Sequence, residues 1–293
     1  MKTIASAIHF FVFSNLFIST CVLCFTVKTS LIIFGNSGNV HVNLLAFSAT
    51  LFLYGFHKVY RRFRFSEAEH KEERHNWVDE HKKTYYTVIA LAFIGAITQL
   101  FYMPLRVFVL MVPVGFMAAG YSIPFIKTKR GFIRLRDISW LKALWIGLSY
   151  AWLTTFLPIA FEYPVNRLLQ PVVIFMFIRN FLFVFALVIP FDIRDLHYDA
   201  KNGMRTLPVI VGIKGAIRLS VGLMFAFIIA TVIQWVYFGF DTWISAALCL
   251  SALEAALVIP FAKPERPNLF FPLAVESSMM LQWALVFAAV HLA

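Results

Sequence analysis

Charged side chains are scarce in this 293-residue sequence, where aspartate, glutamate, lysine and arginine together make up 14%. A typical soluble domain is about one quarter charged, so the shortage excludes an ordinary water-soluble enzyme. A disordered chain is excluded as well, because disorder requires low hydrophobicity and abundant charge. The three cysteines are too few for a disulfide-stapled secreted domain.

Apolar residues are abundant instead and make up 60% of the chain. Because a membrane-spanning helix needs about 20 apolar residues, the sequence predicts an all-α, multi-pass integral membrane protein. We interpret residues 1–293 as one transmembrane domain with a charged cytoplasmic segment at 57–83. The first span lacks a small-residue cleavage site, so we interpret it as a helix and not as a signal peptide. The nine predicted spans are 4–27, 40–60, 84–103, 105–125, 140–160, 168–191, 211–238, 242–262 and 269–291.

Basic residues between the spans predict the orientation in the membrane. Of the 26 lysines and arginines, 21, with Lys142 among them, lie in the connections that follow spans two, four, six and eight or in the span ends next to those connections. The opposite connections carry only Lys28, Arg106 and Arg167. Basic loops stay in the cytoplasm, so we expect the N-terminus inside, the C-terminus outside, and a location in the cytoplasmic membrane. The same rule explains the net charge of +11. We therefore do not expect the protein to bind nucleic acid, and the sequence shows no nucleic-acid-binding module.

The strongest motif follows the sixth span, where segment 191–208 reads FDIRDLHYDAKNGMRTLP. Asp192, Asp195 and Asp199 are spaced i, i+3 and i+7, so on a helix they lie within about 60° of one another. Three carboxylates on one stripe repel each other unless a cation lies between them, and oxygen ligands suit Mg²⁺. The alternative is a solvated helix end with scattered charge.

This aspartate spacing, followed by Lys-x-Gly-x-Arg-Thr-Leu-Pro, resembles the second aspartate-rich motif of the UbiA superfamily of intramembrane prenyltransferases. Segment 121–127, YSIPFIK, is similar to the family's Tyr-Ser-x-Pro segment with basic residues after it. The resemblance implies transfer of a prenyl group from an allylic diphosphate to an acceptor at the cytoplasmic face. It implies that Asp192, Asp195 and Asp199 are the catalytic Mg²⁺ ligands. The implied diphosphate contacts are Lys127, Lys201 and Arg205.

The family's first aspartate-rich motif is expected at the end of the second span, and there the sequence departs from the family. Segment 53–62 reads LYGFHKVYRR, and no carboxylate appears before Glu67. Either basic residues such as His57 and Arg61 bind the diphosphate directly, or the activity has changed or been lost. For Lys58, Arg62 and Arg64 the alternative is a plain positive-inside anchor.

Two further features carry charge. Arg179 lies in the middle of the sixth span, where a cation is costly, and Glu254 and Glu276 are its candidate partners. Segment 66–83 interleaves opposite charges at i, i+4, which predicts a short helix that either caps the active face or is simply solvated.

Two functions of different classes therefore compete. The first is a UbiA-like prenyltransferase whose partners are a prenyl diphosphate, an unidentified acceptor and the lipid bilayer. The second is a catalytically silent membrane protein that keeps the fold and binds lipid or serves as a scaffold. A transporter would show internal repeats and helices interrupted at mid-membrane, and neither is evident in the sequence.

Overall fold

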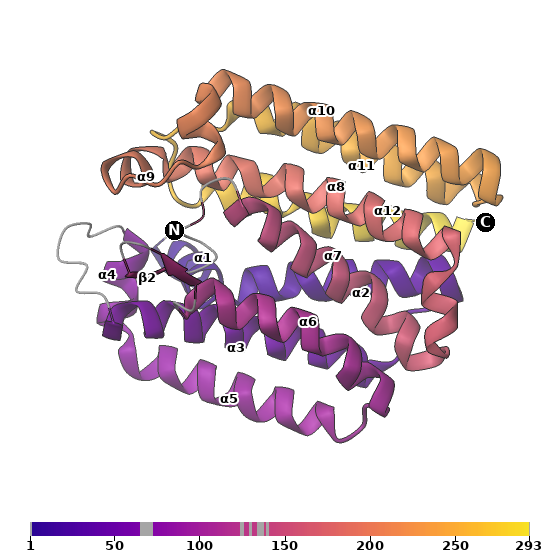
Figure 1. Cartoon of the computed structure of the whole chain (residues 1–293), viewed down its shortest axis with the longest axis horizontal. Coiled ribbons are helices and arrows are strands. Elements are labelled where there is room, and N and C mark those ends of the chain that lie inside the picture. The colour runs from indigo at the N-terminus through magenta and orange to yellow at the C-terminus, as the bar shows by residue number, and fades with distance from the viewer. Residues whose placement is uncertain are drawn as a thin grey trace.

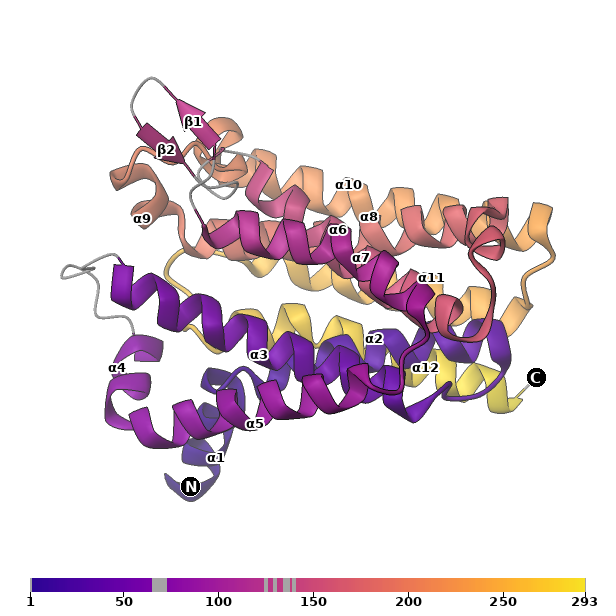
Figure 2. The same cartoon turned by 60° about the horizontal axis from the view of Figure 1, so that its bottom comes forward.

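The helices of this chain form one bundle, as Figures 1 and 2 show. The computed structural model describes residues 2–64, 73–123, 126–128, 131–133, 138 and 141–292. The long helices are α2 (Leu16–Phe34), α3 (Val40–Arg64), α5 (Lys82–Leu100), α6 (Leu105–Ser122), α7 (Leu141–Glu162), α8 (Pro171–Arg194), α10 (Leu207–Phe238), α11 (Thr242–Val258) and α12 (Ser278–Leu292). The shorter elements are α1 (Lys2–Phe13), α4 (Glu73–Glu80), β1 (Ile126–Thr128), β2 (Gly131–Ile133), η2 (Val165–Leu169), α9 (Leu196–Lys201), η3 (Ile259–Phe261) and the π-helical turn η4 (Phe271–Glu276).

Seven helical segments of the described residues are long and apolar enough to cross a membrane. They correspond to α2, α3, α7, α8, α10, α11 with η3, and η4 with α12. Helices α5 and α6 belong to the same bundle, where α5 packs on α3 and α6 packs on α7. The predicted all-α, multi-pass membrane fold is therefore confirmed, with one short β1–β2 hairpin added. The count of nine spans and the orientation stay predictions.

Both ends of the bundle are distinct. Figure 1 places the N-terminus, α4 and α9 at one end and the C-terminus at the other. Helix α4 confirms a short helix in the charged segment 66–83, and it packs against α1 and α5. Residues 66–72 of that segment lie outside the described part of the chain.

The first predicted span, residues 4–27, is wrong as a single helix. The chain bends at Asn15, whose φ of 69° is left-handed, and this residue separates α1 from α2. Asparagine adopts this conformation more readily than most residues, and the Asn15 side chain donates a hydrogen bond to Tyr85 Oη at 3.1 Å. The membrane-spanning helix is therefore Leu16–Phe34, further along the chain than predicted.

That shift moves Lys28 out of its predicted outward-facing loop and into the centre of the bundle, where it is 0% exposed. Its Nζ donates hydrogen bonds to Asn180 Oδ1 at 2.8 Å and to Gln282 Oε1 at 3.0 Å. The two amides donate in turn to Thr155 Oγ1 and Ser251 Oγ, both at 2.8 Å. Because buried polar groups are costly unless they are hydrogen-bonded, this network ties α2, α7, α8, α11 and α12 together.

Replacing Lys28 by methionine is expected to lower the free energy of unfolding by about 2–4 kcal/mol. The change leaves Asn180 Oδ1 and Gln282 Oε1 buried without their donor, at a cost of roughly 1–3 kcal/mol for each acceptor. Thermal unfolding of the detergent-solubilised protein measures the effect. Lys263→Met, at an exposed position, is the matched control and should change stability by less than about 0.5 kcal/mol. Equal stability of the two variants would refute a stabilising role for the network.

Arg179 is also 0% exposed, and the prediction that it pairs with Glu254 or Glu276 is wrong. Within the described residues its guanidinium nitrogens have no hydrogen-bond partner. The guanidinium carbon lies instead 5.8 Å and 5.7 Å from the ring centres of Phe227 and Phe240. The negative faces of aromatic rings attract a cation, so the two rings offset part of the cost of burying this charge.

Helices α7 and α8 pack closely, and this contact shapes one end of the bundle. Gly147 of α7 faces Phe181 and Phe185 of α8, where an added Cβ would come within 3.3 Å of the Phe185 Cα. A glycine here allows the backbones to approach. The approach sets the first turn of α7, with Lys142, beside the last turn of α8, with Asp192.

Candidate active site at the aspartate end of the bundle

The three aspartates lie where α8 gives way to α9. Helix α8 ends at Arg194, and Asp195, at φ −85° and ψ 5°, separates it from α9. The aspartate stripe therefore spans a joint between two helices and not one continuous helix. Gly203, with φ 68°, then turns the chain back toward α10. Both Asp192 and Asp199 end up 1% exposed.

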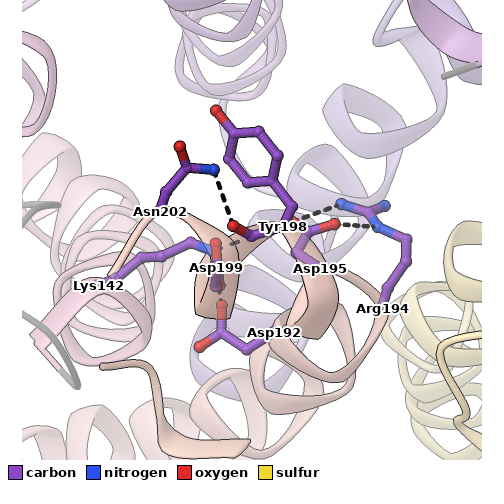
Figure 3. A network of polar contacts seen from close by, with 7 residues as sticks. All are labelled: Lys142, Asp192, Arg194, Asp195, Tyr198, Asp199 and Asn202. Atoms are coloured by element: carbon purple, nitrogen blue, oxygen red, sulfur yellow. Dashed lines mark hydrogen bonds and ion pairs between the residues drawn. The ribbon is translucent and has the colours of Figure 1, made fainter. Parts of the chain in front are cut away.

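Lys142 lies among the three carboxylates, as Figure 3 shows. Its Nζ is 2.7 Å from Asp192 Oδ1, 3.6 Å from Asp199 Oδ2 and 3.9 Å from Asp195 Oδ2. In the sequence this lysine is only one of the basic residues near the connection that follows the fourth predicted span. A lysine at the start of an apolar run is equally typical of an orientation anchor, so no pattern in the sequence distinguishes the two roles. Lys142 lies in the first turn of α7, where the positive end of the helix dipole repels a cation. The three aspartates offset this repulsion by their negative charge.

Asp195 differs from the other two aspartates because a neighbour in the chain holds it. Arg194 Nε and Nη2 donate to its two oxygens at 2.8 Å and 3.2 Å. The Arg194 guanidinium also lies over the rings of Phe191 and Phe271. The Asp195 side chain is 18% exposed. Asp192 and Asp199 are therefore the buried pair of the cluster.

The carboxylates have the donor chemistry for Mg²⁺. Both oxygens of Asp192 and Oδ2 of Asp199 are buried, and within the described residues no group hydrogen-bonds to them apart from the contacts of Lys142 with Asp192 Oδ1 and Asp199 Oδ2. Carboxylate oxygens suit a hard divalent cation. Among the described residues, however, no three acidic, histidine or cysteine side chains already converge as a metal cage. Lys142 and Arg194 form ion pairs with these carboxylates. The carboxylates are therefore suitable Mg²⁺ ligands, but a metal ion would compete for them with two side-chain cations.

The pKa of Asp199 is raised to about 6, chiefly because the carboxyl group is buried. The charge of Lys142 and the nearby Thr206 hydroxyl lower it, whereas the charges of Asp195 and Asp192 raise it further. The group is therefore mostly ionised at pH 7 and mostly neutral at pH 5.

Divalent-cation binding should consequently weaken as the pH falls through 6, by up to about tenfold per pH unit, since a metal ligand must be deprotonated. Titrating the protein with Mn²⁺ at pH 5, 6, 7 and 8 and measuring free Mn²⁺ by electron paramagnetic resonance tests this. Asp199→Asn should bind more weakly throughout and show a flatter pH profile. A profile as steep in the variant as in the wild type would assign the pH dependence to another group.

The basic residues predicted to bind diphosphate remain predictions. Lys127 is exposed on β1, Lys201 is exposed at the end of α9, and Arg205 is exposed in the turn before α10. His57 is half-buried on α3, and the Arg61 side chain lies outside the described part of the structure.

A contact that sequence analysis missed indicates which way α3 faces. Tyr54 Oη and Tyr150 Oη are 2.5 Å apart and join α3 to α7, the helix that carries Lys142. His57 and Arg61 follow Tyr54 at i+3 and i+7, so the three positions lie within about 60° on one face of α3. Lys58 lies on the other flank, 5.5 Å from the ring of Tyr85 on α5.

Comparison with known proteins decides the family. Residues 80–290 match the sequence pattern of the UbiA prenyltransferase family. The chain belongs to the UbiA prenyltransferase family. Digeranylgeranylglyceryl phosphate synthase of Haloquadratum walsbyi is 31% identical over 77 residues, which span 26% of this chain and 27% of that relative.

Solved UbiA structures share the fold over nearly the whole chain. A UbiA homolog from Archaeoglobus fulgidus bound to GPP and Mg²⁺ superposes with a TM-score of 0.66 at 13% identity, over 97% of this chain and 99% of that one. A UbiA homolog from Aeropyrum pernix K1 gives a TM-score of 0.60 at 16% identity, over 94% and 97%. At these identities the likeness establishes a UbiA fold, and the family resemblance seen in the sequence is confirmed.

Proposed function

We propose that this UbiA family member is a Mg²⁺-dependent prenyltransferase that acts at the aspartate end of the bundle, on the cytoplasmic face. The observation that carries the proposal is the cluster of Asp192, Asp195 and Asp199 around a single cation, at 2.7–3.9 Å from Lys142 Nζ. A divalent cation on the same carboxylates would present positive charge to a diphosphate. The Archaeoglobus fulgidus homolog bound to GPP and Mg²⁺ supports this assignment.

In this proposal the bond between the allylic carbon and the diphosphate oxygen breaks, and the diphosphate leaves with the electron pair. The prenyl cation then bonds to a nucleophilic atom of the acceptor, which releases a proton. Mg²⁺ bound to the aspartates supplies electrostatic stabilisation of the leaving diphosphate.

The residues of the chain have three tasks. Asp192 and Asp199 would hold the metal, while Lys201 and Arg205 would donate to diphosphate oxygens from their exposed positions at this end of the bundle. On α3, Arg61 would provide positive charge and His57 a ring N–H donor where the family's first carboxylates are missing. The apolar bundle beneath keeps water from the prenyl cation.

Binding of geranyl diphosphate tests the proposal. Calorimetry on purified protein in nanodiscs, with MgCl₂ and then with EDTA, should show binding that requires the metal. The triple variant Asp192→Ala, Asp195→Ala, Asp199→Ala should lose it. Asp241→Ala is the matched control, because Asp241 caps the start of α11 through a 2.9 Å hydrogen bond from Ile244 N.

Metal-dependent binding that survives in the triple variant would refute the site. Wild-type protein that binds geranyl diphosphate with Mg²⁺ yet transfers no prenyl group to any component of a membrane lipid extract would favour the silent lipid-binding alternative.

A further inference from the structure

Lys142 occupies the position that a metal ion would need. Its ammonium lies within 4 Å of all three aspartates, and residue and partners are enclosed together, with Lys142 9% exposed and Asp192 and Asp199 each 1% exposed. No other lysine or arginine in the described residues has ion-pair contacts to more than one of these carboxylates.

Distances show that the ammonium and the metal exclude each other. Mg²⁺ binds carboxylate oxygens at about 2.0–2.1 Å, whereas Lys142 Nζ already lies 2.7 Å from Asp192 Oδ1. Two cations on the same oxygen would lie within a few ångströms and repel strongly in a buried site. A metal can therefore use Asp192 only after the lysine has moved away.

Counting charges leads to the same conclusion. With all three aspartates ionised, Lys142 and Arg194 leave the cluster with a net charge of −1. Adding Mg²⁺ to that arrangement would create a net positive charge in a buried place, which is unfavourable. With Lys142 withdrawn, the remaining two negative charges match one Mg²⁺.

Lys142 lies in the first turn of α7, and its flexible four-carbon chain allows the ammonium to change partners without moving the helix. Under the proposed function, the diphosphate binds beside the aspartates. An ammonium that leaves the aspartates can then pair with a diphosphate oxygen.

We propose that Lys142 is an internal competitor of the metal, which holds the aspartates together when metal is absent and transfers its charge to the diphosphate when metal binds. The inference rests on the proposed function. The consequence is that metal and diphosphate increase each other's affinity. Diphosphate favours the displaced ammonium, which makes room for the metal, and the metal releases the ammonium to pair with the diphosphate. Metal alone must displace the ammonium, whereas metal with diphosphate gives the ammonium a new partner.

Mn²⁺ binding without any diphosphate provides the test, with free Mn²⁺ measured by electron paramagnetic resonance. Lys142→Met should bind Mn²⁺ about tenfold or more tightly than the wild type, within the range of a typical coupling between two ligands. Lys142→Arg, which keeps the charge, should bind no more tightly than the wild type. Lys263→Met is the control for the loss of an exposed lysine, and Lys142→Gln repeats the test if the methionine variant does not fold.

Geranyl diphosphate supplies the second arm. In the wild type it should increase Mn²⁺ affinity, and in Lys142→Met this increase should be smaller by about tenfold. Mn²⁺ binding that is unchanged or weaker in both Lys142→Met and Lys142→Gln would overturn the inference and make the lysine a residue that only orients the aspartates. The triple aspartate variant separates the two proposals, because its loss of Mn²⁺ binding upholds the metal site whichever way the lysine variants behave.

Discussion

Replacing Asp192 by asparagine is expected to lower kcat/KM for prenyl transfer by about 1,000-fold. The Asp192 carboxylate makes the shortest contact in the cluster, at 2.7 Å to Lys142 Nζ, and both of its oxygens are buried with no other hydrogen-bond donor among the described residues. Asparagine keeps the shape but removes the negative charge, and at 1% exposure water has no access to replace it. Losses of about 100- to 1,000-fold are typical when one electrostatic contact to a transition state is removed.

Asp195→Asn is the matched comparison, because it makes the same chemical change within the same motif. Asp195 is more exposed and both of its oxygens are held by Arg194, so its loss should cost about tenfold, as for a supporting group near a metal. Steady-state kinetics with geranyl diphosphate, at saturating Mg²⁺, measures both variants. A larger effect for Asp195 than for Asp192 would show that the order of importance inferred from burial is wrong.

The double variant His57→Asp, Arg61→Asp is expected to bind geranyl diphosphate about 100-fold more weakly at low Mg²⁺ and to require more metal. A diphosphate carries nearly three negative charges, and one metal on the single aspartate motif leaves about one uncompensated. Replacing Arg61 by aspartate reverses one charge and replacing His57 by aspartate adds a negative one; at an effective dielectric constant of about 20, with screening by salt, the two changes together should weaken binding by about 3 kcal/mol. Calorimetric titrations at low and high Mg²⁺ measure both effects.

Single variants locate the source of this effect on α3. Position 61 comes seven residues after Tyr54, on the face of α3 from which Tyr54 contacts α7. Lys58→Asp makes the same charge change as Arg61→Asp, but on the flank near Tyr85 of α5. Arg61→Asp should weaken binding much more than Lys58→Asp. If the double variant instead gains a prenyl-transfer activity that the wild type lacks, the basic residues do not replace the first motif, and the wild type is a silent member of the family.

Much of this protein was predictable from local features of the sequence. Apolar content and the lengths of the apolar runs determined the helical membrane fold, because backbone groups in a bilayer must be satisfied within helices or closed barrels. The aspartate spacing and the Gly-x-Arg-Thr-Leu-Pro turn that follows it pointed to the candidate site and to the family, because both features are written in one short segment of the chain. These are properties of short segments, which a sequence records directly.

Tertiary structure alone decided which charged groups meet. Lys28 was predicted in a loop, but the bend at Asn15 moves α2 along the chain and brings that lysine to Asn180 and Gln282. Lys142 looked like one more orientation anchor, and it contacts Asp192, some 50 residues away, because α7 and α8 approach closely at Gly147. Hydropathy and charge along the chain do not predict such contacts. The contacts depend on how helices distant in the sequence pack and on which polar groups then lie next to a buried cation.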